Sequence, residues 1–239
     1  MASEAFSPEE TRRYSRHLVL KGMGGAGQQK LKAARVLVVG AGGLGSPAIA
    51  YLAAAGVGTL GIADSDSVAV SNLQRQVIHR TADIDRAKTE SAADFVRERN
   101  PYVAVVEHPA IEGNDADQVL AGYDLVLDGT DTLTSRRIVA AAAARLRLPL
   151  VSGAMSMFDG QVTVFAPGGP SFEAVFPPEA DDADLPGCEV TGIIGPLPGV
   201  IGSLMAMEAI KLITGIGTPL VGRVLVYDGK RGEFTTLEV

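Results

Sequence analysis

Cysteine is nearly absent from this chain of 239 residues. Cys188 is the only one, which excludes an internal disulfide framework and any zinc site built from several cysteines. The three histidines, His17, His79 and His108, stand too far apart to show metal-ligand spacing. No apolar run reaches the roughly 20 residues of a membrane helix, and no signal peptide precedes Phe6. We therefore expect no membrane association and a cytoplasmic protein.

Basic stretches are also missing. The chain has 21 Lys and Arg against 28 Asp and Glu, a net charge of −7, and no cluster of cations that would follow a phosphate backbone. Nucleic acid is therefore not an expected partner. What the chain does have is 46% hydrophobic residues, enough to bury a full core without disulfides or metals.

The chain is organised around a glycine-rich turn. Four apolar residues at 36–39 predict a buried strand, and Gly40, Gly42 and Gly45 follow it with G-x-G-x-x-G spacing. An Ala-rich apolar run at 44–55 then predicts a helix. A strand, a tight glycine turn and a helix N-terminus together form a phosphate cradle, because glycine lets the backbone approach an anion that the helix dipole favours.

A second strand is predicted at 58–63 and ends at Asp64, about the spacing at which a carboxylate meets a nucleotide ribose. The sequence therefore predicts a nucleotide site, with NAD as the default nucleotide for this pattern. The structural alternative is a glycine-rich turn that only packs a helix against a sheet.

Two cationic side chains follow. A polar loop, Ser71-Asn72-Leu73-Gln74-Arg75-Gln76, offers Asn72 and Arg75 to the cradle, although a capped turn with a solvated arginine has the same pattern. The predicted helix 86–99 carries Lys88 in its first turn, where the helix dipole disfavours a cation. A lysine that faces phosphate would overcome this penalty, and the alternative is a lysine that faces solvent.

Two carboxylates lie at the carboxyl edge of the sheet, because Asp128 ends the predicted strand 123–128 and Asp131 follows it in the next loop. Carboxylates beside a phosphate site suggest Mg²⁺. The alternative is that Asp131 or Thr132 only caps the Ala-rich helix 133–147, and both can hold together.

The remaining pattern predicts an α/β Rossmann-like, doubly wound and mainly parallel sheet. Ser7, Pro8 and Glu10 begin an N-terminal helix that ends before the glycines at 22–27. Further elements are expected in this order: a strand at 102–107, a helix at 115–122, strands at 150–152 and 160–165, a long loop at 167–187, an apolar helix at 199–215 with Met205 and Met207 inward, and a hairpin of strands at 222–227 and 233–239. The last strands extend the sheet in antiparallel fashion.

Four motifs in this order resemble the ThiF/MoeB/HesA family, bacterial relatives of ubiquitin-activating enzymes. They are Gly-Ala-Gly-Gly-Leu-Gly at 40–45, the loop 71–76, Asp-Gly-Thr-Asp at 128–131, and Gly-Val-Ile-Gly-Ser at 199–203 ahead of Glu-Ala-Ile-Lys at 208–211. The resemblance implies that ATP, not NAD, takes the cradle. It also implies that the enzyme adenylates the C-terminal glycine of a ubiquitin-like sulfur carrier with a Gly-Gly tail, releasing pyrophosphate.

The resemblance also implies a single adenylation domain over 1–239, with a helical arm at 1–33, a nucleotide-binding core at 34–152 and a crossover loop and carrier-binding part at 153–239. Asp131 would bind Mg²⁺, and Arg16 would reach the ATP of a partner subunit in a homodimer. Cys188 would be catalytic in sulfur transfer yet dispensable for adenylation. The residues implied to bind the nucleotide are Gly42, Gly43, Asp64, Ser71, Asn72, Leu73, Gln74, Arg75, Lys88, Asp131 and Thr132.

The chain departs from this family in two places. Ser171 and Ala174 stand where the family's first Cys-x-x-Cys pair would bind zinc, so no zinc site is expected. Thr132 replaces the family's asparagine and can still cap the following helix. Competing functions are an NAD-dependent oxidoreductase, for which no hydride-transfer His or Tyr-x-x-x-Lys is recognisable, and a catalytically silent nucleotide-binding scaffold. The choice between a ThiS-like carrier for thiamin, a MoaD-like carrier for molybdopterin and another sulfur carrier stays open.

Overall fold

The computed structural model describes residues 6–113, 115–182 and 191–239. The helices are α1 (Pro8–Arg13), α2 (Ser15–Leu18), α3 (Gly24–Ala33), α4 (Gly45–Ala55), α5 (Lys88–Arg99), α6 (Ala116–Leu120), α7 (Leu133–Leu146) and α9 (Pro196–Thr214), with 3-10 turns η1 (Val70–Asn72), η2 (Thr81–Asp83) and η3 (Phe172–Ala174). The strands are β1 (Arg35–Val39), β2 (Thr59–Ala63), β3 (Ala104–His108), β4 (Leu125–Asp128), β5 (Leu150–Ser156), β6 (Asp159–Phe165), β7 (Arg223–Asp228) and β8 (Glu233–Glu238).

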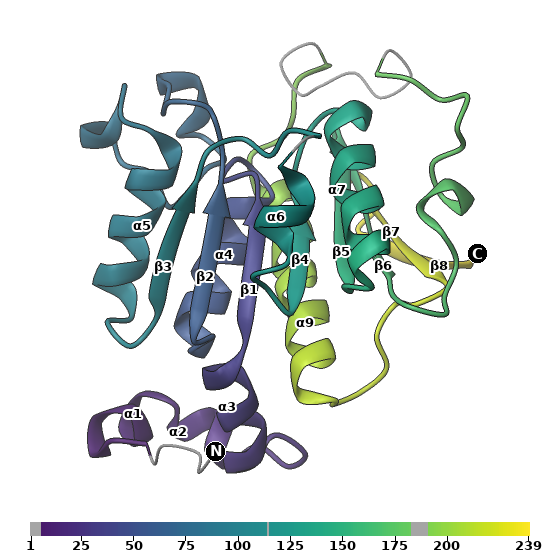
Figure 1. The fold of residues 1–239 in the computed structure, drawn as a ribbon. Helices are drawn as coiled ribbons and strands as arrows, with labels where there is room; N and C mark the ends of the chain where they lie inside the picture. Colours follow the sequence, from purple (N-terminus) through teal and green to yellow (C-terminus); the bar gives the residue numbers. More distant parts are fainter. Residues whose placement is uncertain (1–5, 114, 183–190) are drawn as a thin grey trace.

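The strands form a sheet of eight in the order β3-β2-β1-β4-β5-β6-β7-β8 (Figure 1). Strands β1 to β5 pair in parallel. Strands β6, β7 and β8 pair antiparallel to their neighbours. The expected fold, a mainly parallel Rossmann-like sheet that antiparallel C-terminal strands extend, is confirmed.

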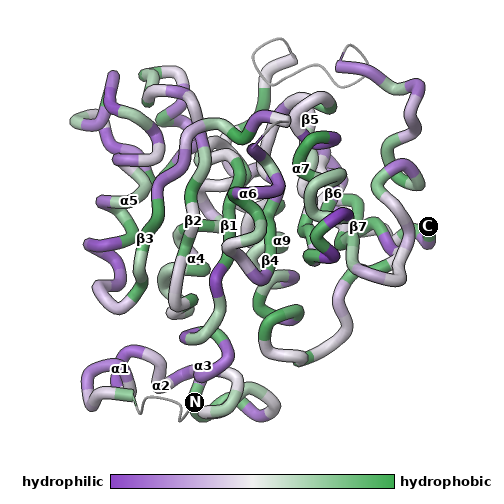
Figure 2. Tube along the Cα trace, viewed as in Figure 1, coloured by the Kyte–Doolittle hydropathy of each residue, from purple (hydrophilic) through white to green (hydrophobic). Residues whose placement is uncertain are grey.

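Strand β1 is buried on both faces because helices cover both sides of the sheet. Val36 and Val38 belong to the core under α4 and α9, whereas Leu37 and Val39 belong to the core under α6 and α7. A strand between two apolar layers has no polar face, which explains the unbroken apolar run at 36–39. Figure 2 shows the same distribution, with apolar residues along β1, β4 and α9.

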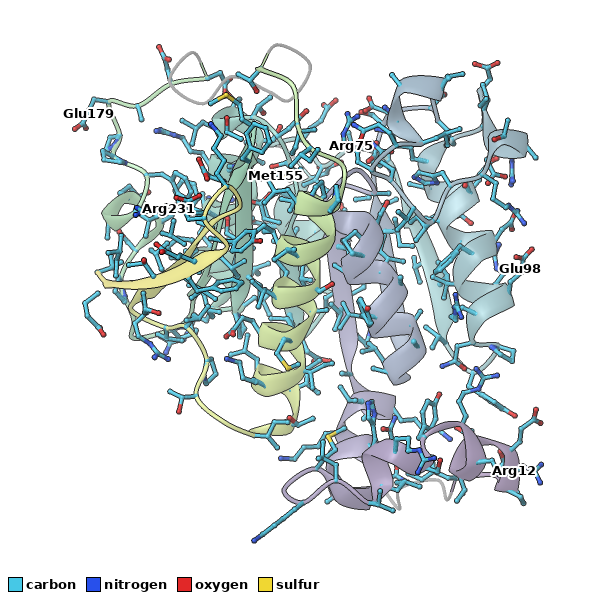
Figure 3. The ribbon with its side chains drawn as sticks, turned by 180° about the vertical axis from the view of Figure 1, so that it is seen from behind. Arg12, Arg75, Glu98, Met155, Glu179 and Arg231 are labelled. Atoms are coloured by element: carbon cyan, nitrogen blue, oxygen red, sulfur yellow. The ribbon has the colours of Figure 1, made fainter. Side chains whose placement is uncertain are left out.

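Helix α9 packs beside α4 in one of these layers (Figure 3). By length and composition it is a helix that could cross a membrane, but half of that stretch is buried inside the protein. At Gly202 a Cβ would lie 2.4 Å from the backbone oxygen of Leu44, so glycine permits the close contact with α4. Met205 is fully buried as predicted, but Met207 is 53% exposed, so its predicted inward position is wrong. Residues that are two positions apart on a helix lie on nearly opposite faces, so Met205 and Met207 cannot both face the core.

The N-terminal arm begins with the predicted capping box. The backbone N–H of Glu10 donates to Ser7 Oγ at 3.1 Å, and that of Ser7 donates to Glu10 Oε2 at 2.9 Å. The predicted break at 22–27 is shorter than expected, because α3 already begins at Gly24. The buried side chains of Gln28 and Leu31 hold α3 against the core, and Gln28 Nε2 donates to the backbone oxygen of Ala55 at 2.7 Å. Tertiary packing therefore overrides the weak helix propensity of glycine.

Three boundaries in the C-terminal part differ from the sequence prediction. Strand β5 runs to Ser156 rather than to residue 152, because it pairs with β6 along its whole length. Helix α9 begins at Pro196, ahead of the predicted start. The loop predicted at 167–187 contains η3, where Phe172 stacks on Phe176 with ring centroids 4.7 Å apart. This aromatic pair belongs to the core under α7.

Candidate functional site

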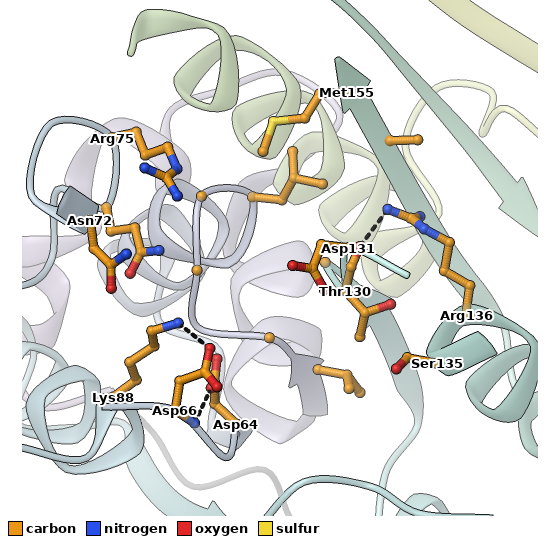
Figure 4. A pocket seen from close by; sticks show the side chains of 18 of the residues that line it. Asp64, Asp66, Asn72, Arg75, Lys88, Thr130, Asp131, Ser135, Arg136 and Met155 are labelled. Atoms are coloured by element: carbon orange, nitrogen blue, oxygen red, sulfur yellow. Dashed lines mark hydrogen bonds and ion pairs between the residues drawn. The ribbon is translucent and has the colours of Figure 1, made fainter. Parts of the chain in front are cut away.

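A cleft of about 720 Å³ opens at the carboxyl ends of the parallel strands. The glycine turn forms its floor, and the loop after β2, the start of α5, the loop after β4, the end of β5 and the start of β6 surround it (Figure 4). The structure brings together in its lining these residues singled out from the sequence: Gly42, Gly43, Asp64, Ser71, Asn72, Arg75, Lys88 and Asp131.

The glycine turn has a conformation that other residues do not fit. Gly40 has a φ of +93°, and a Cβ at Gly45 would lie 1.8 Å from the backbone oxygen of Gly40. Asp64, the residue after β2, stabilises the turn, because its Oδ2 accepts a hydrogen bond from the backbone N–H of Ala41 at 2.8 Å. The other oxygen of Asp64 accepts from the backbone N–H of Asp66 at 2.8 Å. Asp64 thus joins the end of β2 to the cradle and stays half-buried at its edge.

Lys88 is the first residue of α5, and its side chain is only 7% exposed. Its Nζ forms an ion pair of 2.7 Å with Asp66 Oδ2, and its backbone N–H donates to the backbone oxygen of Asp66 at 2.9 Å. Asp66 is 66% exposed and lies at the same cleft (Figure 4). The carboxylate explains how the protein tolerates a lysine at a helix N-terminus, and it places the ammonium group where an anionic ligand can meet it.

Asn72 and Arg75 lie on the same side of the cleft as Lys88 (Figure 4). Asn72 is buried, and its Oδ1 accepts from the backbone N–H of Ala69 at 3.1 Å, which closes the η1 turn. Arg75 is half-buried, and its Nη1 donates to the backbone oxygen of Ser71 at 2.9 Å. That bond holds the guanidinium over the cleft, and in the described part of the chain its other N–H groups remain available to a ligand.

Two residues of this loop do not line the cleft. Leu73 and Gln74 are absent from its lining, and Gln74 packs instead against the start of α9, where a Cβ at Gly195 would lie 2.5 Å from its backbone oxygen. Gln76, which the sequence reading left without a role, does line the cleft. It is 3% exposed, and its Oε1 is buried with no hydrogen-bond partner among the described residues. No local sequence signal separates Gln76 from Gln74.

Asp128 and Asp131 have different environments. Asp128 is fully buried, and its Oδ2 pairs with Arg136 Nη1 at 3.2 Å. Its Oδ1 accepts from the backbone N–H of Thr130 at 3.0 Å, so Asp128 organises the loop after β4. Asp131 is exposed at the cleft and has no hydrogen-bond partner within the ranges that the structure describes. Asp131 is therefore the carboxylate that is free to meet a cation.

Arg136 was not predicted as a site residue, because an arginine in the first turn of an Ala-rich helix is expected to face solvent. It is 4% exposed, donates to the backbone oxygen of Gly153 at 2.6 Å and also donates to that of Thr130. Thr132 lies outside the cleft lining. It caps α7, with its Oγ1 accepting from the backbone N–H of Ser135 at 3.1 Å. The capping alternative thus holds for Thr132, and the cation alternative remains for Asp131.

Among the described residues there is no group of three or more His, Cys, Asp and Glu side chains that could hold a metal ion. A single exposed carboxylate still fits Mg²⁺, which usually binds one or two carboxylates together with substrate phosphates. Ser171, which stands at one position of the missing Cys-x-x-Cys pair, directly precedes η3. The rings of Phe165, Phe172 and Phe176 pack against one another in this region. Cys188 lies outside the described residues.

Arg16 is exposed on α2 and far from the cleft of its own chain. In Figure 1 the arm helices lie at the end of the sheet opposite to the cleft, and Figure 3 labels Arg12 and Arg75 at these opposite ends. Arg16 therefore does not join the other candidate residues within one chain.

Residues 14–239 match the ThiF family. The chain belongs to the ThiF family. Over 99% of its length this ThiF-family protein is 45% identical to the probable adenylyltransferase/sulfurtransferase MoeZ of Mycobacterium tuberculosis, of which it spans 62%. It is 43% identical over 98% of its length to the sulfur carrier protein adenylyltransferase of Thermus thermophilus, of which it spans 89%.

A solved structure of E. coli MccB with ATP has the same fold. The TM-score is 0.82 at 22% identity, and the match covers 95% of this chain and 71% of MccB. Because the identity is low, this likeness concerns the arrangement of the sheet and its helices rather than individual site residues.

Proposed function

We propose that this protein is an ATP-dependent adenylyltransferase that activates the C-terminal glycine of a ubiquitin-like sulfur carrier, either ThiS-like or MoaD-like. The observation that carries the proposal is the convergence of Arg75, Lys88 and the glycine turn on one cleft. Two cations beside a helix N-terminus suit a triphosphate better than a dinucleotide. The names of the relatives MoeZ and sulfur carrier protein adenylyltransferase support the same reaction.

In the proposed reaction a carboxylate oxygen of the carrier attacks the α-phosphorus of ATP. The new bond is a mixed carboxylic–phosphoric anhydride, and the bond from the α-phosphorus to the bridging oxygen breaks, so that pyrophosphate leaves with the electron pair. A terminal carboxyl group has a pKa of about 3.3–3.7 and is ionised at neutral pH, so no general base is needed. The obstacle is the repulsion between the anionic nucleophile and the polyphosphate, which cations and orienting groups reduce.

The residues of the cleft divide this task. Asp64 would bind the ribose, while Gly42 and Gly43 would let the phosphates approach the backbone. Asn72, Arg75 and Lys88 would bind the phosphates. Lys88, which pairs with the exposed Asp66 in the structure, would then exchange that partner for a phosphate. Asp131 would hold Mg²⁺, which when bound neutralises charge on the phosphates.

We also propose a homodimer in which Arg16 of each subunit completes the cleft of the other. The proposal is supported by the position of α2 at the end of the sheet opposite to its own cleft (Figure 1). The end of β5 and the start of β6 also line the cleft, which supports the proposal that residues after 153 receive the carrier tail. Cys188 would serve sulfur transfer after adenylation.

Carrier-dependent exchange of radiolabelled pyrophosphate into ATP tests the proposal directly. The purified protein is incubated with Mg·ATP and either a ThiS-like or a MoaD-like carrier, and with each carrier lacking its last two glycines. Exchange that needs the intact tail is expected. A calorimetric titration that shows NAD binding and no Mg·ATP binding would instead favour the oxidoreductase, and ATP binding without exchange would favour the silent scaffold.

A further inference from the structure

His79 is a buried histidine beneath the glycine turn, and the proposed reaction gives it no role. His79 is only 6% exposed. Its Nε2 lies 3.0 Å from the backbone oxygen of Ala41, and its Nδ1 lies 2.8 Å from Oγ of Ser91 on α5. A carbonyl oxygen only accepts, so Nε2 carries a hydrogen and donates it to Ala41. Burial lowers the pKa of His79, which favours the neutral ring, whose single N–H is then the one on Nε2.

The contact with Ala41 fixes the direction of the next N–H group. The peptide bond between Ala41 and Gly42 is trans, like every described peptide bond, so its C=O and N–H lie in one plane and point in opposite directions. The C=O points to the buried His79, which does not line the cleft, whereas Gly42 does. The N–H of Gly42 therefore points away from the interior, and in the described part of the chain it meets no hydrogen-bond acceptor.

The neighbouring groups of the turn are held in the same way. The N–H of Ala41 donates to Asp64 Oδ2 at 2.8 Å, and the backbone oxygen of Gly42 accepts from the N–H of Ser46 at 2.9 Å. His79 adds the third support, because it holds the group whose rotation would turn the Gly42 N–H. Glycine resists such rotation less than other residues do, so this turn depends on external hydrogen bonds.

We propose that His79 is a positioning residue: by holding the Ala41 carbonyl it aims the Gly42 N–H at the phosphates of the bound nucleotide. The inference rests on the proposed function, because it requires a phosphate-bearing ligand in the cleft. His79 touches neither that ligand nor the reacting atoms. Without its donor the Ala41 carbonyl is buried and unpaired, and the peptide gains freedom to turn away from the phosphates.

Two substitutions distinguish the nitrogens of the ring. The amide nitrogen in His79→Gln reaches the place of Nε2, whereas the shorter amide in His79→Asn reaches only toward Ser91. ATP and adenosine are titrated calorimetrically into both variants. We expect His79→Asn to weaken ATP binding by about 10- to 100-fold, the effect of losing a hydrogen bond to a charged group, while His79→Gln stays within about 3-fold of the parent. Adenosine, which has no phosphate, should bind all proteins alike.

His108→Gln is the matched control, since it removes a partly buried histidine whose Nε2 lies 2.6 Å from the Tyr123 hydroxyl instead of a carbonyl of the glycine turn. It should leave ATP affinity unchanged. Equal ATP affinity of the Asn and Gln variants, or an equal loss for ATP and adenosine, overturns the role of His79 while the proposed function stands. A parent protein that binds no ATP overturns both.

A second measurement needs no variant and stays decisive if His79→Asn does not fold. In ¹⁵N-labelled parent protein, the Gly42 amide resonance should shift when ATP is added and stay in place when adenosine is added. An unchanged Gly42 resonance at saturating ATP contradicts the inference.

Discussion

The buried pair of Asp128 and Arg136 should be among the most sensitive places in the molecule. Asp128 Oδ2 accepts hydrogen bonds from Arg136 Nη1 at 3.2 Å and from Ser152 Oγ at 3.1 Å. Its Oδ1 accepts from the backbone N–H of Thr130 at 3.0 Å and from the Thr130 hydroxyl at 2.7 Å. The side chains of Asp128 and Arg136 are 0% and 5% exposed, so neither charge has water as a substitute partner. Asp128→Asn keeps the shape but removes the negative charge.

We expect Asp128→Asn to lower the free energy of unfolding by about 3–5 kcal/mol, because it leaves the arginine charge buried without a counter-ion. For a chain of this size that corresponds to a fall in Tm of roughly 6–20 °C. Arg136→Met should cost a similar amount, and the double variant should cost less than the sum by about 2 kcal/mol, because it leaves no unpaired charge. Urea denaturation followed by circular dichroism measures all three values.

The matched control is the surface pair of Arg145 and Asp117, whose side chains are 55% and 50% exposed. Arg145→Met should change the free energy of unfolding far less than Asp128→Asn does, although its Nη2 lies 2.6 Å from Asp117 Oδ1, because water and salt screen an exposed pair. If Asp128→Asn costs no more than this control, the argument from burial is wrong.

Four other outcomes are expected. Arg75→Ala should lower carrier-dependent turnover by a factor of about 10²–10³ with the fold intact, as when one positioned electrostatic group is removed, and a near-normal rate would contradict its role. Mixing Arg16→Ala with Asp131→Ala subunits should restore one intact cleft per mixed dimer, and a mixture as inactive as its parents despite verified subunit exchange refutes action across the dimer. Cys188→Ala should keep pyrophosphate exchange near normal, since adenylation uses no thiol, and loss of exchange in the folded variant would assign the thiol to the first step. Burial alone would raise the pKa of Asp83, but hydrogen bonds from the backbone and side chains around it lower the pKa to about 2. Because the folded pKa lies below the usual 3.8, ionised Asp83 contributes about 2 kcal/mol above pH 4, lost as the pH falls toward 2. The difference in unfolding free energy between the parent and Asp83→Asn should shrink over that range, and a constant difference contradicts this account.

The sequence was sufficient for features that local spacing determines. The glycine turn at 40–45, the capping box of α1 and the position of Lys88 at the start of α5 follow from residues close together in the chain. Eight of the eleven residues expected to bind the nucleotide also line the cleft, because parallel strands bring their carboxyl ends to one edge of the sheet.

What the sequence could not supply depends on contacts between distant segments. Arg136 is buried because Asp128 and the backbone of Gly153 meet it, and these groups come from different strands. Gln76 and Gln74 are alike as residues, and only the packing of the loop against α9 decides which one faces the cleft. Helix α3 extends through Gly24 because its buried face outweighs its propensity.

The alternation along β1 links folding accuracy to the cleft. Val36 and Val38 enter one core, Leu37 and Val39 enter the other, and Gly40 follows at once. A shift of pairing by a single residue would send each side chain into the opposite layer and move the glycine turn by about 3.3 Å along the strand. Incorrect register would therefore disturb both helical layers and the cleft together. A chain that has reached its stable packing has, by the same step, set the position of its phosphate cradle.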